Sequence, residues 1–373
     1  MVRAYDTGVE RAIESMHRQY RTLLRNDTSF SLRELFSSPA YDIAEMSASF
    51  RPNRFGPEAC WATEQFCRAH RIWLENGDDY NSMTPYLHPG AIDAERMTII
   101  GIFNAILFWL NDTIGREKFG HLSPSKQNNA HVTVARLSQL FGEHHPPADP
   151  TDLESAVIRF LEMLTRSADP AWVDRFLRLT EEHLLPALRD QNARTRGSVL
   201  PIADYIDLRN QISGMCLALA LCEFGRDSYL PWGRITSSRL GGALRRLRLL
   251  TVEIGGLMND VFSFEKECIA DRADFNLIPI VLLNSADNDL SDAIFQACEI
   301  VRRRVIAFSH TKTRLIDAAD AAPDRDLGAR IATHVADLTS CVQATWVWQN
   351  ATPRYKGKSI FAENQTLATS GNT

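Results

Sequence analysis

The chain has 373 residues, enough for one large domain or two ordinary ones. Hydrophobic residues make up 45% of it and charged residues 23%, which is typical of globular proteins in water. Its net charge of −5 gives no basic surface, so we expect neither nucleic acid nor an anionic membrane as a partner.

The seven cysteines are scattered along the chain and form no Cys-x-x-Cys pair. This predicts buried free thiols in a reducing compartment, so we expect a cytoplasmic protein. The first residues carry no apolar run of a signal peptide. The most apolar stretch, residues 97–110, is too short to span a bilayer and contains Thr98 and Asn104, so no membrane span is expected.

Apolar residues recur at spacings of three and four almost everywhere, which predicts an all-α chain. We expect a single-domain helical bundle at residues 56–360, with a helical extension at 1–55 packed on it and a flexible tail at 361–373. The expected helices cover residues 9–24, 57–74, 91–112, 130–141, 153–165, 170–192, 202–224, 234–269, 277–283, 290–318 and 327–350.

The expected helix 91–112 is apolar nearly all round, so it belongs in the centre of the protein. It ends at Asp112, and a carboxylate there is costly unless something pairs with it. Asp112 either bonds Arg116 one turn on, as an ordinary helix end, or it is a metal ligand at the mouth of a cavity.

Arg209 lies inside the apolar helix expected at 202–224. A buried guanidinium needs a carboxylate or a phosphate, and its fork of donors suits either. The partner is Asp207, a carboxylate on a neighbouring helix, or a bound phosphate. We expect this helix to break near Ser213-Gly214, where glycine would let the backbone approach a substrate.

Three oxygen-bearing side chains, Asn259, Ser263 and Glu267, are spaced four residues apart. On an α-helix each step of four turns the face by only about 40°, so the three share one side. Amide, hydroxyl and carboxylate oxygens are the hard ligands that suit Mg²⁺. Lys266 could reach an anion bound beside the metal, and Arg354-Tyr355 adds two further donors. The alternative is a polar stripe at the wet end of a helix.

Together these residues resemble the class I terpene synthases of microbial type. Residues 259–267 match the second metal-binding motif of the family, N-D-x-x-S-x-x-x-E, at every defining position, and Lys266 matches its usual Lys-Glu ending. Arg209 resembles the diphosphate-sensing arginine of the family, and Arg354-Tyr355 resembles its C-terminal pair. Trp348 resembles a tryptophan that packs against the cation-bearing cavity.

Asp112 falls where the family has its Asp-rich motif, and Glu95 fits the looser pattern that precedes it. The motif departs from D-D-x-x-D and D-D-x-x-x-E, because Thr113 follows Asp112. Glu117 takes the place of the final acid, but five residues turn a helix by about 500°, or 140° net. Glu117 therefore faces away from Asp112 unless the helix breaks near Gly115, and it is the weakest member of the ligand set.

The resemblance implies a terpene cyclase fold with a central apolar cavity, and it implies the following chemistry. Mg²⁺, with three ions expected, binds the diphosphate of a linear prenyl substrate, farnesyl or geranylgeranyl diphosphate. Loss of diphosphate leaves a carbocation that cyclises to a sesqui- or diterpene. The implied metal ligands are Asp112, Asn259, Ser263 and Glu267, and the implied catalytic residues are Asp112, Arg209, Lys266, Arg354 and Tyr355.

The expected cavity lining comprises Phe103, Phe108, Trp109, Ser213, Gly214 and Trp348. Aromatic faces stabilise cations, although simple core packing is the ordinary role of each such ring. We expect the loop that carries Arg354 to close over the substrate and exclude water.

Two alternatives remain open at this stage. A chain-elongating prenyl transferase would need a second Asp-rich motif in place of the Asn/Ser/Glu set. A non-catalytic helical scaffold would use the same polar stripes only to solvate helix ends. The sequence also leaves a homodimer open.

Overall fold

The computed structural model describes residues 3–119, 122–143 and 146–366, with backbone alone at 116, 117 and 143. Apart from one short antiparallel pair, β1 (Arg3–Ala4) with β2 (Ser198–Val199), the elements of these residues are helices, so the predicted all-α class is confirmed. The longer helices are α1 (Thr7–Arg25), α4 (Gly56–Ala69), α7 (Ala94–Ile114), α9 (Pro124–Glu143), α10 (Asp152–Ser167), α11 (Pro170–Leu188), α13 (Ile202–Ile212), α14 (Met215–Gly225), α16 (Gly241–Phe264), α17 (Leu277–Asn284), α18 (Leu290–Asp320) and α19 (Arg325–Ala351).

The shorter elements connect these helices. They are α2 (Leu32–Phe36), α3 (Ile43–Ser47), α5 (Gly77–Asn81), α6 (Thr84–Leu87), α8 (Arg116–Phe119), α12 (Ala193–Arg196), α15 (Trp232–Thr236), a π-helix at Glu265–Ala270, and two 3₁₀ turns at Pro353–Tyr355 and Ala362–Asn364.

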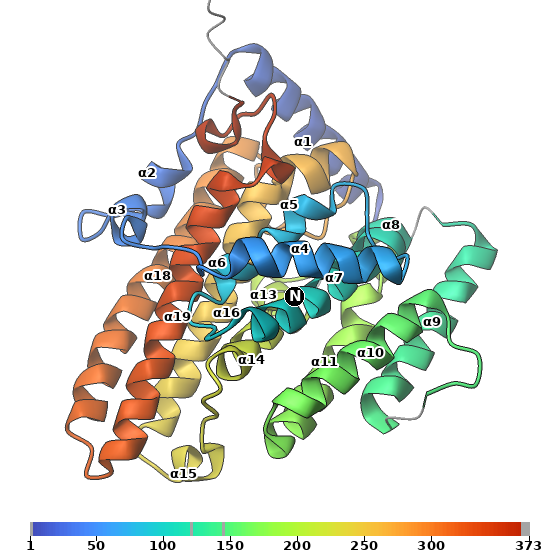
Figure 1. The fold of residues 1–373 in the computed structure, drawn as a ribbon. Coiled ribbons are helices and arrows are strands. Elements are labelled where there is room, and N and C mark those ends of the chain that lie inside the picture. The colour runs from blue at the N-terminus through green and yellow to red at the C-terminus, as the bar shows by residue number, and fades with distance from the viewer. Residues whose placement is uncertain (1–2, 120–121, 144–145, 367–373) are drawn as a thin grey trace, which may run out of the picture.

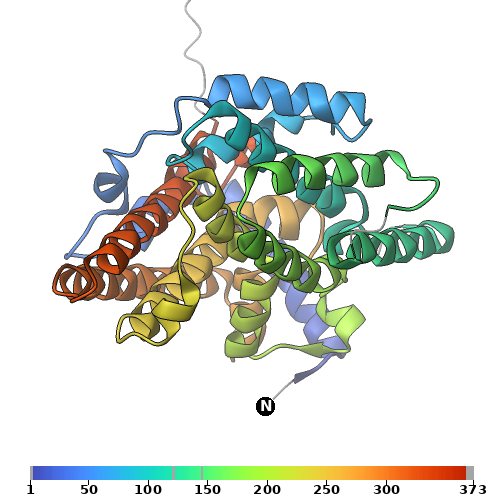
Figure 2. The same ribbon diagram turned by 60° about the horizontal axis from the view of Figure 1, so that its bottom comes forward.

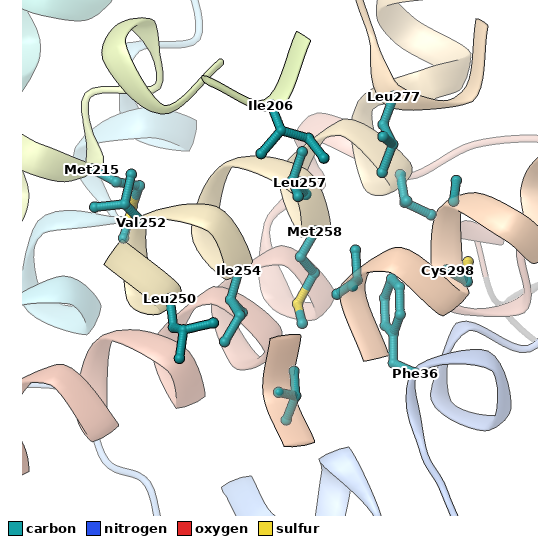
Figure 3. Packing of buried hydrophobic residues seen from close by; sticks show 14 of the residues in the cluster. Phe36, Ile206, Met215, Leu250, Val252, Ile254, Leu257, Met258, Leu277 and Cys298 are labelled. Atoms are coloured by element: carbon teal, nitrogen blue, oxygen red, sulfur yellow. The ribbon is translucent and has the colours of Figure 1, made fainter. Parts of the chain in front are cut away.

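Helix α16 is the centre of the main core. It contacts α13, α14, α17, α18 and α19, and nearly all its residues from Leu250 onward are buried. Figure 3 shows that side chains on several sides of α16, including Val252 and Met258, are surrounded by apolar side chains of neighbouring elements. A helix buried on all sides positions its polar residues rigidly, and those of α16 include Asn259 and Ser263.

Helix α7 is the centre of a second core, where it packs against α4, α10 and α11. Figures 1 and 2 show α4 lying across this part of the molecule and α9–α11 forming one side of it. The stretch predicted to be too short to span a bilayer lies in α7, which alone among the described helices is long and apolar enough to cross a membrane, so the expectation about its length is wrong. Half of the most apolar window of α7 is buried inside the protein. Its apolar surface therefore has partners within the fold.

The helix expected at 202–224 breaks as predicted. Ile212 ends α13 and Met215 begins α14, while Gly214 between them has a φ of 74°. That left-handed conformation is readily adopted by glycine and costs other residues about 1–2 kcal/mol.

The prediction of one helix over 234–269 is wrong at its start, whereas its end is right in position but differs in helix type. A turn separates α15 from α16, because the Ser237 and Ser238 hydroxyls donate to the carbonyls of Gly233 and Ile235. Such local bonds compete with helical ones. At the other end the α-helix stops at Phe264 and continues as the π-helix.

The tail expected to be flexible from Phe361 is held in place over its first residues. Phe361 and Asn364 are fully buried, and Phe361 forms a bridge with Phe30. The expectation is therefore wrong for residues 361–366, while 367–373 lie outside the described residues. Residues of α1 and α2, including Met16 and Phe36, belong to the main core, as expected for an extension packed on the bundle.

Replacement of Gly101 by Val should lower the free energy of unfolding by about 1–3 kcal/mol, because it overpacks the contact between α7 and α4. A Cβ at Gly101 would lie 2.4 Å from Thr63 Oγ1. Urea denaturation followed by circular dichroism measures the change. Gly242→Ala is the control, since nothing lies within 4 Å of a Cβ there. Equal stability of Gly101→Val and the wild type would contradict the close packing.

Candidate active site

Asp112, near the end of α7, meets the C-terminal part of the chain at the rim of the bundle. Arg354 Nη1 lies 3.4 Å from Asp112 Oδ2, and its guanidinium lies over the rings of Tyr80 and Phe108, 4.8 and 5.8 Å from their centroids. Burial opposes ionisation of Asp112, but the charges of Arg354 and Lys266 outweigh it and lower the pKa of this carboxyl. Asp112 is thus held as an anion.

Asn259 connects this ion pair to α16. Its Nδ2 donates to Tyr355 Oη at 2.9 Å, next to Arg354 in sequence, and to Gln349 Oε1 at 3.4 Å. Its Oδ1 accepts from Arg209 Nη2 at 3.2 Å. The structure therefore brings Asp112, Arg354, Tyr355, Asn259 and Arg209 into one continuous network at the end of the bundle.

The partner of Arg209 is Asp260, the second residue of the Asn-Asp motif. Arg209 Nε lies 2.8 Å from Asp260 Oδ1, and Tyr205 donates its hydroxyl to the other carboxylate oxygen. Asp260 is fully buried and Arg209 is 4% exposed. Burial alone would lower the pKa of Arg209, but the charge of Asp260 raises it overall. Of the predicted alternatives for the partner of Arg209, the carboxylate on a neighbouring helix is confirmed, and Asp207 is not the partner. Sequence reasoning missed Tyr205.

The π-helix changes the predicted geometry of the last candidate ligand. Asn259 and Ser263 lie on the α-helical part, where Ser263 is fully buried and its Oγ lies 3.5 Å from the Asp260 carbonyl. Glu267 lies after the change of helix type, accepts from Asn276 Nδ2 at 3.3 Å and lines the cavity described below. The single α-helical stripe expected for all three therefore ends at Ser263. Short π-helical segments are frequent at functional sites.

Lys266 lies near a second acidic residue that the sequence did not single out. Its Nζ is 4.0 Å from Asp271 Oδ2, and Lys118 Nζ of α8 is 3.4 Å from Asp271 Oδ1. This cluster brings α8, the π-helix and the following loop together beside Asp112.

An apolar cavity opens beside this network. Its lining includes Phe108, Ser213, Gly214 and Trp348, as predicted, together with Arg209, Asn259, Glu267, Arg354 and Tyr355. Apolar lining comes from several helices: Met83, Leu87, Leu107, Leu110, Leu184, Ala187, Leu188, Ile212, Met215, Ala218 and Ala344. Trp348 is fixed by a 3.0 Å hydrogen bond from its Nε1 to Ser82 Oγ.

Two of the expected lining residues do not line the cavity. Phe103 is fully buried in the second core, with ring centroids 5.2 Å from Phe160 and 5.0 Å from Phe176. Trp109 is half-buried and packs against the same core. On an α-helix, positions 103 and 109 turn away from Phe108, and a sequence that is apolar all round does not show which side faces the cavity.

Glu95 and Glu117, the two further acidic residues assigned to the Asp-rich region, differ in how they lie relative to Asp112. Glu95 is exposed in the first turn of α7, seventeen residues or about 26 Å of helix from Asp112, so it is remote from the site. The helix does break at Gly115, the condition under which Glu117 could face the same way as Asp112. The side chain of Glu117 lies outside the described residues.

Asn104 is a polar residue of the cavity wall that sequence reasoning did not assign to the site. It lies within apolar α7, is 6% exposed, and donates from Nδ2 to Thr84 Oγ1 at 3.0 Å. Its position among apolar neighbours was the available signal, since a buried amide is costly without partners.

Residues 102–306, more than half of the chain, match the family model described as "Terpene synthase family 2, C-terminal metal binding". The chain therefore belongs to this terpene synthase family. It is 24% identical to Sesquiterpene synthase 6 of Postia placenta over 323 residues, 86% of each chain. It is 25% identical to (2Z,6E)-hedycaryol synthase of Kitasatospora setae over 276 residues, 72% of this chain and 77% of that one.

The other comparisons agree. The chain is 22% identical over 253 residues to (12E)-labda-8(17),12,14-triene synthase of Streptomyces anulatus, covering 67% of this chain and 74% of that one. The linalool/nerolidol synthase structure from Streptomyces clavuligerus shares the fold, with a TM-score of 0.67 over 82% of this chain and 97% of that one at 18% identity. The predicted reaction class is confirmed: the protein is a terpene cyclase, a lyase acting on prenyl diphosphates, with a metal-binding domain.

Replacement of Arg209 by Met should lower the free energy of unfolding by about 3–5 kcal/mol, because it leaves the buried carboxylate of Asp260 unpaired. Thermal and urea denaturation measure this loss. The matched control is Arg234→Met, which breaks an exposed pair with Asp324 and should cost less than about 1 kcal/mol. Equal losses in the two variants would show that the buried pair is not a stabilising contact.

Proposed function

We propose that this terpene cyclase uses Mg²⁺ and binds the diphosphate of its substrate at the network of Asp112, Arg354, Tyr355, Asn259 and Arg209, called the rim network below. The hydrocarbon chain of the substrate would lie in the adjoining cavity. The observation that supports this most directly is the contact chain from Asp112 through Arg354 and Tyr355 to Asn259 at the edge of an apolar cavity. Such a site presents anionic and cationic groups to one end of a ligand and apolar groups to the remainder.

The proposed metal ligands are Asp112, Asn259, Ser263 and Glu267. Their oxygens are hard donors, and two of the four are carboxylates, which suits Mg²⁺. Among the described residues no three His, Cys, Asp or Glu side chains form a metal cluster. This donor set fits an ion that is held by one or two carboxylates and completed by phosphate oxygens of the substrate. The expected number of three ions stays a prediction.

Four residues are proposed to donate to the diphosphate: Arg209, Lys266, Arg354 and Tyr355. Arg354 is held by Asp112 and the rings of Tyr80 and Phe108, so its fork is oriented before the substrate arrives. Arg209 lines the cavity while it also fixes Asn259, so it both orients a metal ligand and offers charge. A bound divalent metal would neutralise the leaving diphosphate and so assist its departure.

The cavity is proposed to protect the carbocation that remains. The rings of Phe108 and Trp348 can stabilise a cation through their faces, and the apolar wall excludes water. Farnesyl and geranylgeranyl diphosphate are both retained as substrates, since the relatives named above include a sesquiterpene synthase and a labdatriene synthase. The free cysteines support the expected cytoplasmic location, and the homodimer stays a prediction.

Incubation of the purified protein with farnesyl or geranylgeranyl diphosphate and Mg²⁺ tests the proposal, with products identified by gas chromatography and mass spectrometry. We expect a cyclic terpene and free diphosphate, and no turnover after chelation of the metal. A longer prenyl diphosphate would show a chain-elongating transferase instead, and no turnover on either substrate would favour the scaffold.

Asn259→Ala and Glu267→Ala should each abolish detectable turnover while the circular dichroism spectrum stays helical, because each removes a proposed metal ligand. The control is Glu95→Ala at the opposite end of α7, which should keep wild-type kcat/KM. Full activity in either ligand variant would refute its assignment to the metal.

Asn104→Leu should change the ratio of terpene products while KM for the substrate stays near the wild-type value. The substitution replaces an amide dipole beside the cation by an apolar side chain of similar size. Product ratios from gas chromatography measure the effect. Leu107→Met, an apolar and volume-conserving change in the same wall, should alter the ratio less. An unchanged ratio in Asn104→Leu would show that the amide does not influence the cation.

A further inference from the structure

The carboxylate of Glu265 joins three segments that are far apart in the sequence. Its Oε1 accepts from Tyr20 Oη of α1 at 3.1 Å and from the Ile360 backbone N–H at 2.9 Å. Its Oε2 accepts from Ser359 Oγ at 2.5 Å. Glu265 itself begins the π-helix that follows α16. One side chain thus connects α1, the helical segment that continues α16, and the C-terminal residues.

The C-terminal strap, defined here as residues 356–366, is also held from its other side by the N-terminal segment. The Phe30 N–H donates to the Ile360 carbonyl at 2.8 Å, and the Ala362 N–H donates to the Phe30 carbonyl at 2.9 Å. Aromatic contacts add to these bonds, since the Phe361 ring lies 6.4 Å from the rings of both Phe264 and Phe30. Figure 1 shows the strap, in dark red, at the same end of the molecule as α1.

A second carboxylate on the strap ties it to α2. Glu363 accepts from the backbone N–H groups of Leu32 and Arg33, each at 2.8 Å, and so satisfies free donors in the first turn of α2. Asn364, which is fully buried, donates to the Phe262 carbonyl of α16 at 3.0 Å. The strap therefore lies between α2 and α16 and forms hydrogen bonds with both.

The strap directly follows the two residues that reach the rim network. Arg354 pairs with Asp112 and Tyr355 with Asn259, and only Lys356-Gly357-Lys358 separates them from Ser359. On the π-helix, Glu265 bonds the strap while Glu267, two residues on, lines the cavity. The same short helix thus connects the strap and the site.

We propose that Glu265 is a positioning residue for the cyclisation reaction. By fixing the strap it holds Arg354 and Tyr355 over the diphosphate site. The N-terminal segment from α1 to α2 holds the strap as well, and the two sets of contacts together are called the clamp. The inference rests on the function proposed above for that site. It gives residues 7–36, which lie outside the part of the chain matched by the family model, a role in holding the two residues that reach the mouth of the cavity.

The variants Glu265→Ala and Tyr20→Phe test this role. In Glu265→Ala we expect kcat/KM for farnesyl diphosphate with Mg²⁺ to fall about 10- to 100-fold, since a small displacement of reacting groups has effects of that size. We also expect a larger share of uncyclised alcohol, because water reaches the cation before ring closure. Tyr20→Phe removes one of the three bonds and should show the same changes to a smaller extent, and Glu265→Gln should recover part of the activity.

A second readout needs neither metal nor substrate. Lys358 is exposed within the strap, so the rate of trypsin cleavage after it in the metal-free protein reports how firmly the strap is held. The rate should rise in Glu265→Ala and, less, in Tyr20→Phe. If Glu265→Ala gives no cooperative melting transition, the kinetics and the rate of trypsin cleavage are measured on Tyr20→Phe instead, since that variant lacks only one hydroxyl.

The matched control is Glu223→Gln, a change at another buried carboxylate, which pairs with Arg175 and is 2% exposed. It should lower the melting temperature but leave the alcohol share and Lys358 cleavage at wild-type values. The proposal is overturned if Glu265→Ala keeps wild-type kinetics, products and cleavage, or if Glu223→Gln reproduces its changes. A wild-type protein without turnover on any prenyl diphosphate would refute the proposed function instead, and faster cleavage of Glu265→Ala would then still show the clamp.

Discussion

The buried ion pair between Arg209 and Asp260 is the contact on which the geometry of the site depends. It joins α13 to α16 where both helices carry functional groups, and it uses the carboxylate that directly follows the proposed ligand Asn259. A charge pair in an apolar interior is costly unless all its members are well bonded, and here Tyr205 completes the set. The position of Asn259 is therefore fixed by its neighbours rather than by the helix alone.

This constraint explains why the break in the helix is tolerated. The chain turns at Gly214, five residues after Arg209, and the ion pair anchors the segment before the turn. Beyond the turn, Met215 and Ala218 face the cavity along with Gly214. The interrupted helix thus contributes Arg209 to the polar side of the site and Met215 and Ala218 to its apolar wall, with the glycine between them.

Much of this could be predicted from the sequence, because spacing carries information about helices. The periodicity of apolar residues gave the helical class, and the spacing of Asn259 and Ser263 placed both on one face of a helix. The conformational freedom of glycine indicated a break near Ser213-Gly214. The family resemblance gave the reaction class, which the comparisons confirm.

Other features depend on contacts between distant residues, which spacing does not encode. The π-helix after Phe264 could not be foreseen, because changing the bonding pattern by one residue leaves no compositional signal. The orientation of α7 was hidden by its uniform apolarity, so Phe103 and Trp109 were assigned to the wrong side. The burial of Phe361 depends on Phe30 and Phe264, more than 300 and about 100 residues away in the sequence.

The apolar wall of the cavity also has a consequence for the end of the reaction cycle. The leucine, isoleucine, methionine and aromatic side chains of this wall also favour a neutral hydrocarbon, because burial of its apolar surface is favourable in itself. Once the diphosphate has gone, such a product has little that draws it back toward water. Release of a neutral terpene from this wall therefore works against its own hydrophobic burial, and product release limits turnover in many enzymes.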